Sequence, residues 1–227
     1  MDCPKAEVLI LNFSSNEYFL SPFLDDMPKL RALILINYST SNIVFHNLSV
    51  FHNLNNLRSL WFEKIYVPQI FDTTIPLKNL QRVSLILCDI DTGLDQSAID
   101  LPRIFPRSSE LAIDHCINLN KLPSSICRMH TLKILNVTNC DSLQELPADL
   151  GKINFLQLLR LYSCLNLKRL PVSIGHLVWL KYLDISQCVT MGCLLEGVYG
   201  ARATDEGAGV WGFWAEGTCL GIGWSRF

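Results

Sequence analysis

Five cysteines are the residues of this chain whose type and spacing could support chemistry. Cys116, Cys140, Cys164 and Cys188 lie 24 residues apart, and Cys88 precedes them in a looser copy of the same pattern. Thiols stacked about one strand spacing apart would be within disulfide reach, which would suit a metal or redox ladder. Metal sites, however, need short C-x₂₋₄-C pairs that converge on one ion. Because cysteine is small and tolerates burial, the pattern favours a structural column of buried thiols.

Other residue types share this spacing. Leu122-Pro123, Leu146-Pro147 and Leu170-Pro171 keep the same step of 24 residues, and the regular unit reads LxxLxLxxCxxLxxLPxxLGxLxx. A repeat of this length and leucine pattern indicates leucine-rich repeats. The predicted fold class is therefore an α/β leucine-rich-repeat solenoid. It would be a curved horseshoe with parallel strands on its concave face and an irregular or short helical convex side.

The repeats predict two regions in the chain. Residues 1–190 are expected to form a solenoid of about eight repeats, with units that begin at residues 6, 30, 57, 80, 108, 132, 156 and 180. The early units are looser, as in Leu30-Leu33-Leu35-Tyr38. Residues 191–227 contain nine of the twelve glycines and no repeat, so we interpret them as a poorly ordered or aberrant tail, or as a cap.

The alternating LxL positions predict which side chains the concave face presents. Leucines point inward and the residues between them point outward. The expected partner-binding residues are Ile10, Ile34, Ile36, Trp61, Ile86, Asp114, Asn136, Arg160, Tyr162 and Asp184. The apolar members cluster in the early units, which favours an interface over scattered exposed residues. The later members, with Glu110 and Tyr182 beside them, suit protein recognition or a solvated face.

Composition and motifs exclude several function classes. A net charge of −2 with both signs interspersed gives no nucleic-acid footprint. No apolar run is long enough to cross a membrane, and the N-terminus lacks the pattern of a secretory signal. Because the P-loop, G-x-S-x-G and H-E-x-x-H motifs are missing, we expect no catalytic residues, metal site or cofactor in this chain. Without a signal, the cysteines favour a reduced, cytoplasmic location.

Three segments carry a family resemblance. LAIDHCINLNKLPSSIC, LQLLRLYSCLNLKRLPVSIG and LKYLDISQC resemble plant NLR immune receptors, most closely the activated-disease-resistance helper subfamily with a coiled-coil N-terminal domain. The resemblance implies that the repeats follow a nucleotide-binding module, and ADP or ATP is expected only in that module. It also implies that the repeats restrain this switch and contact lipase-like signalling proteins.

Together these observations predict a protein-interaction module of a plant intracellular immune receptor. It would act in defence by partner binding and autoregulation, as a fragment that lacks the nucleotide-binding module. A stand-alone intracellular scaffold or decoy is one alternative. An extracellular receptor ectodomain is another, for which the N-x-[ST] sequons at Asn12, Asn37, Asn47 and Asn136 would supply glycosylation sites.

Overall fold

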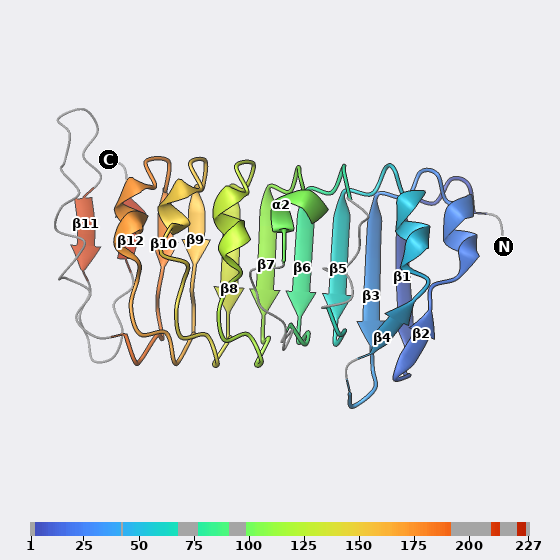
Figure 1. The fold of residues 1–227 in the computed structure, drawn as a ribbon, viewed down its shortest axis with the longest axis horizontal. Coiled ribbons are helices and arrows are strands. Elements are labelled where there is room, and N and C mark those ends of the chain that lie inside the picture. The colour runs from blue at the N-terminus through green and yellow to red at the C-terminus, as the bar shows by residue number, and fades with distance from the viewer. Residues whose placement is uncertain are drawn as a thin grey trace.

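The fold is a long parallel sheet covered on one side by short helices (Figure 1). This computed structural model describes residues 3–41, 43–67, 77–90, 99–191, 210–213 and 222–225, the last two ranges as strands. Eight parallel strands follow one another in chain order along the sheet. They are β1 (Val8–Phe13), β3 (Ala32–Asn37), β5 (Ser59–Glu63), β6 (Arg82–Ile86), β7 (Glu110–Asp114), β8 (Ile134–Thr138), β9 (Leu158–Arg160) and β10 (Tyr182–Asp184). One of these strands lies in each unit that the sequence predicts.

Short helical turns lie on the opposite side of the molecule from these strands (Figure 1). They are η1 (Pro22–Asp26), η2 (Leu48–His52), α2 (Leu101–Ile104), η4 (Ser124–Arg128), η5 (Leu150–Lys152) and η6 (Val172–His176). Pro123 and Pro171 of the Leu-Pro pairs cap η4 and η6 with φ of −61° and −68°. Proline fixes φ in this range and removes a donor, and each helical turn begins directly after the extended proline. A small parallel sheet of β2 (Glu17–Phe19) and β4 (Val44–His46) lies in the early coils.

A single apolar core runs through the stacked coils. The first leucine of each LxL signature meets its counterpart in the next coil, as Leu9 meets Leu33 and Leu135 meets Leu159. Leu33, Leu135 and Leu159 are fully buried between neighbouring coils. No coil could bury these side chains alone, so stacking supplies the stability. The predicted solenoid class is confirmed by this architecture.

A left-handed residue bends the chain at the end of most strands. Lys64, Leu87, His115, Asn139, Ser163 and Gln187 have φ between 53° and 63°. Each lies directly before an inward residue, which is Ile65 in the third coil and the column cysteine in the later ones. The bend therefore interrupts the alternation of the strand and turns the next side chain into the core.

The second coil differs from the sequence prediction. The second unit places Tyr38 at the repeat position that a cysteine occupies in the later units, but Tyr38 is 64 % exposed, and Asn37 is buried instead. Strand β3 stays extended through Asn37 without a left-handed residue, so the inward alternation continues to this position. Asn37 Nδ2 donates to the carbonyl oxygens of Ser41 at 2.8 Å and Lys64 at 3.2 Å. Its Oδ1 accepts from the Ser39 amide at 3.0 Å.

We expect Asn37→Ala to destabilise the protein by about 2 kcal/mol, because it removes three hydrogen bonds made by a buried side chain. Tyr38→Ala is the matched neighbour and should change the unfolding free energy by less than about 0.5 kcal/mol. Urea unfolding followed by circular dichroism measures both values. A larger loss for Tyr38→Ala than for Asn37→Ala would contradict this inward assignment.

The sheet ends in an antiparallel pair. Strand β12 (Ile222–Ser225) pairs antiparallel with β10 at Leu183 and with β11 (Val210–Phe213) on its other side. The remaining residues of the predicted tail, 192–209, 214–221 and 226–227, lie outside the described residues. The poorly ordered or aberrant tail therefore stays a prediction.

Candidate functional site

The sheet face turned away from the helices, which we call the open face, presents the side chains between the inward leucines. Nine of the ten predicted binding residues lie in its strands. The tenth, Tyr162, follows β9, where its carbonyl oxygen accepts from the Asn139 amide at 2.9 Å. Because the strands pair in register, residues at equivalent repeat positions form continuous rows across the coils.

An apolar patch occupies the first three coils of the open face. Ile10, Ile34 and Trp61 are consecutive partners in one row. Ile36 lies two residues beyond Ile34 on the same face, and Ile10 and Trp61 are 54 % and 39 % exposed. Val8 is 57 % exposed on the same face but was not among the predicted binding residues. The alternation of the first strand could have identified it. We define these five residues as the apolar patch.

Ile86 does not belong to this patch. Glu63 lies between Ile36 and Ile86 in their row, because it pairs with both of them. A carboxylate therefore separates the predicted fifth member from the others.

A polar cluster lies on the later coils. Arg160 donates through Nε to Asp184 Oδ2 at 3.2 Å, and its guanidinium carbon lies 5.5 Å from the centre of the Tyr182 ring. The Tyr182 hydroxyl is 3.4 Å from Arg160 Nη2, and this contact and the Asp184 carboxylate raise the pKa of Arg160. Ser186 donates to the other oxygen of Asp184. The guanidinium is thus oriented by neighbours within the chain, and Tyr162 lies exposed in the same coil.

Asp114 forms a separate cluster at the end of β7. Its carboxylate accepts from Thr138 Oγ1 and from Asn139 Nδ2 at 2.8 Å, and it lies 3.0 Å from His115 Nδ1. Partial burial alone would raise the pKa of Asp114, but these hydrogen bonds and the His115 charge hold it below its usual value. Asn136, the remaining predicted residue, has a buried Oδ1 without a hydrogen-bond partner among the described residues.

The five column cysteines are buried and donate to the preceding coil. Cys88 Sγ lies 3.5 Å from the Phe62 carbonyl oxygen, Cys164 Sγ lies 3.4 Å from that of Val137, and Cys188 Sγ lies 2.8 Å from that of Leu161. Burial raises the pKa of Cys88, Cys140 and Cys164 to about 12. Cys88, Cys116, Cys140 and Cys164 form no disulfide, and their raised pKa keeps them protonated, so they are weak nucleophiles and poor metal ligands. This geometry supports the structural interpretation of the column.

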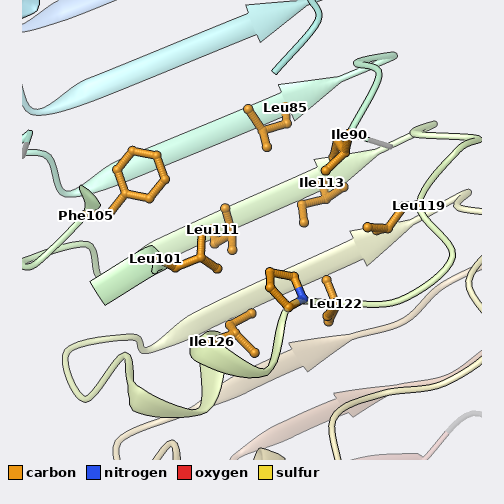
Figure 2. A pocket seen from close by; sticks show the side chains of 10 residues that line it. Leu85, Ile90, Leu101, Phe105, Leu111, Ile113, Leu119, Leu122 and Ile126 are labelled. Carbon is orange, nitrogen blue, oxygen red and sulfur yellow. The ribbon is translucent and has the colours of Figure 1, made fainter. Parts of the chain in front are cut away.

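One small cavity lies inside the core beside α2 and η4 (Figure 2). Its volume is about 20 Å³, and its lining, which includes Leu101, Phe105 and Ile126, is entirely apolar. A space of this size holds about one water, and it offers that water no polar partner. It is a packing defect rather than a substrate pocket.

Among the described residues no group of three or more His, Cys, Asp or Glu side chains is arranged to hold a metal ion. The helices described by the structure include none that is long and apolar enough to span a membrane.

The sequence of this chain is similar to those of plant disease resistance proteins. A probable disease resistance protein of Arabidopsis thaliana is 52 % identical over 135 residues, which are 60 % of this chain and 16 % of that protein. Disease resistance protein ADR1 of the same plant is 47 % identical over 138 residues, 60 % of this chain and 18 % of ADR1. The chain thus spans less than a fifth of the length of these relatives. No model of a known protein family matches it.

A solved structure shares the fold. The leucine-rich repeat domain of the type III effector XopL superposes with a TM-score of 0.54 at 25 % identity, covering 71 % of this chain and 54 % of that domain. The chain is therefore a leucine-rich-repeat solenoid that is similar in sequence to plant disease resistance proteins, ADR1 among them.

Proposed function

We propose that this chain is a protein-binding module of plant disease resistance, which holds its partners on the open face and catalyses no reaction. The observation that carries the proposal is the apolar patch, formed by Val8, Ile10, Ile34, Ile36 and Trp61 on adjoining strands. Contiguous exposed apolar area of this kind, of the order of a few hundred Å², is typical of interaction sites. The similarity to disease resistance proteins supplies the biological setting.

The two ends of the open face suit different contacts. The apolar patch suits a stable intramolecular surface, and we assign it to the nucleotide-binding module that precedes the repeats in the NLR family. ADP and ATP would bind to that module rather than to this chain. The Arg160 cluster is polar and preoriented, and an arginine stacked on tyrosine is a typical anchor for a second protein, such as a lipase-like signalling partner.

We place the function inside the cell. The thiols of Cys88, Cys116, Cys140 and Cys164 are buried and form no disulfide, as expected in a reducing compartment. Two of the sequons are also poorly placed for a glycan, because the Asn37 amide is held by two carbonyl oxygens and Asn136 Oδ1 is buried. These features weigh against the extracellular alternative. A stand-alone scaffold or decoy would use the same face without the adjoining module.

The proposal predicts that Trp61→Glu weakens binding to the nucleotide-binding module of a related disease resistance protein at least about thirtyfold, since a buried interface tryptophan often contributes more than about 2 kcal/mol. Ile36→Glu, beside it, should act in the same direction. Biolayer interferometry with the two purified proteins measures the dissociation constants.

Val178→Glu is the matched control, because Val178 is an 81 % exposed apolar residue in the turn that leads into β10. It should bind like the unchanged chain, and the melting curves of all three variants check that they fold. Equal affinity for Trp61→Glu and Val178→Glu would remove the apolar patch as the binding site. Loss of binding only on Arg160→Ala would favour the scaffold alternative.

A further inference from the structure

The turns that lead into the strands carry an excess of positive charge. They lie along the edge of the sheet at which the strands begin (Figure 1). From the second to the eighth coil these turns contain seven Lys and Arg residues and no Asp or Glu. Their ranges are 28–31, 55–58, 78–81, 106–109, 130–133, 154–157 and 178–181.

The opposite edge of the sheet, at which the strands end, is acidic. The corresponding four-residue segments of the same coils contain four acids, Glu63, Asp89, Asp114 and Asp141, and one lysine, Lys64. Along the chain the two signs are interspersed, but in the fold they separate to the two edges. The net charge of −2 does not reveal this separation.

A ladder of backbone hydrogen bonds holds the basic residues in one row. The Arg58 amide donates to the Arg31 carbonyl oxygen at 2.8 Å, and the Lys133 amide donates to that of Ser109 at the same distance. The ladder continues to Lys181 in the eighth coil. Each step is one strand spacing of about 4.8 Å, so the six steps from Arg31 to Lys181 span about 29 Å.

Most of these cations have no charged partner within the chain. Arg31 forms an ion pair with Glu7 at 3.2 Å, whereas the other six form none among the described residues. Arg107 Nη1 donates only to the neutral Oδ1 of Asn79, at 3.1 Å. All six are exposed, and we define them as the basic edge: Lys29, Arg58, Lys78, Arg107, Lys133 and Lys181. An ordinary solvated surface would mix acids among them.

We propose that the basic edge binds an extended, acidic segment of a partner protein. An extended chain advances about 3.3 Å per residue, so about nine residues cover the 29 Å row and direct alternate side chains toward it. Gln81 and Gln157 occupy the ladder positions between the cations, and an amide side chain can both donate to and accept from peptide groups. Phe155, 52 % exposed in the turn before β9, adds apolar surface beside them.

The chemistry of the edge favours a protein segment over a phosphate polymer or a lipid surface. Phosphate groups mainly accept hydrogen bonds, so they would leave the amide oxygens of Gln81 and Gln157 without donors. The net charge of −2 also gives the whole chain no long-range attraction for a large polyanion. A narrow segment that lies within a Debye length of the edge, about 8 to 10 Å, meets mainly its cations.

Fluorescence anisotropy tests the proposal on the full chain with a fluorescein-labelled peptide of about nine residues, with glutamate at alternate positions and serine between them. We expect saturable binding in about 50 mM salt that weakens at least about fivefold in about 300 mM salt, because exposed charges are screened. The same peptide with glutamine in place of glutamate should not bind. Arg58→Glu combined with Lys133→Glu should raise the dissociation constant at least about tenfold.

Lys168→Glu combined with Arg169→Glu is the matched control. These two exposed residues lie in the turn before η6, away from the basic edge, and the variant has the same net charge. It should bind within about twofold of the unchanged chain. Melting curves check that both double variants fold. Equal affinity for the two double variants, or no binding by the unchanged chain, overturns the proposal.

Two further probes distinguish other polyanions. Vesicles that contain phosphatidylserine and a single-stranded oligothymidylate should each bind more weakly than the acidic peptide at equal salt. Tighter binding of either one, lost in the Arg58 and Lys133 double variant, would replace the acidic segment as the occupant. Trp61→Glu should leave peptide binding unchanged, so this result is independent of the partner proposed for the apolar patch.

Discussion

Gly151→Ala should destabilise the solenoid by about 3 kcal/mol, the upper range for overpacking a filled core. A Cβ at this position would lie 1.9 Å from the backbone oxygen of Ser173 and 2.8 Å from its carbonyl carbon. Helical turns η5 and η6 stack here, and the Gly151 amide donates to Ser173 Oγ at 3.1 Å. Because the obstacle is backbone rather than a flexible side chain, the coils themselves must move apart.

Gly175 provides the matched control at the equivalent position of the next coil. Nothing lies within 4 Å of a Cβ built there, and neither glycine has a left-handed φ. Gly175→Ala should therefore change the unfolding free energy by less than about 0.5 kcal/mol. Urea titrations of both variants measure the difference. Similar midpoints for the two alanine variants would contradict the close stacking of η5 and η6.

Alkaline pH should unfold the protein steeply, because the column thiols must stay protonated in the folded state. Burial raises the pKa of Cys88, Cys140 and Cys164 from 9.0 to about 12, and that of Cys116 further still. Above pH 9 the unfolded chain releases these protons while the folded chain keeps them, so stability is complete below pH 9 and falls as pH rises toward 12. Together, four such groups lower the free energy of unfolding by about 5 kcal/mol for each pH unit in this range.

Unfolding is therefore expected about two pH units above the ordinary thiol pKa, since small proteins are stable by only about 5 to 15 kcal/mol. Circular dichroism across an alkaline titration, with urea midpoints at each pH, measures the slope. Replacing Cys116 and Cys140 together with alanine should reduce the slope by about half, because two of the four groups are removed. Thiolate absorbance near pH 9 that is present in the folded protein and is lost when Cys116 and Cys140 are replaced would show that the column is not buried as described.

The strands and the cysteine column could be predicted from sequence because both follow the repeat period. Every LxL signature became a parallel strand, and Cys116, Cys140 and Cys164 lie at one buried repeat position. That Asn37 rather than Tyr38 is buried could not be predicted in this way. It depends on whether the residue before the column position adopts a left-handed conformation. Residues as different as Leu87 and His115 adopt it, and no glycine marks the position in the sequence.

The rows of side chains on the open face could be predicted from the sequence, but the contacts between these side chains could not. Alternation placed Ile34 and Trp61 on the open face and put Glu63 in the row between Ile36 and Ile86, but it could not give the contacts that the side chains make. The Arg160 cluster likewise depends on side-chain conformations, which bring Tyr182 and Asp184 onto one guanidinium. A repeat pattern fixes the direction of a side chain, whereas its neighbours depend on the register between coils.

The central claim is that a protein partner covers the open face at its first coils. Hydroxyl-radical footprinting of the complex with the nucleotide-binding module compares Trp61, which is 39 % exposed on that face, with Trp179, which is 55 % exposed in the turn before β10. The account predicts that partner binding protects Trp61 from oxidation and leaves Trp179 as reactive as in the free chain. Protection of Trp179 with Trp61 unchanged would contradict it.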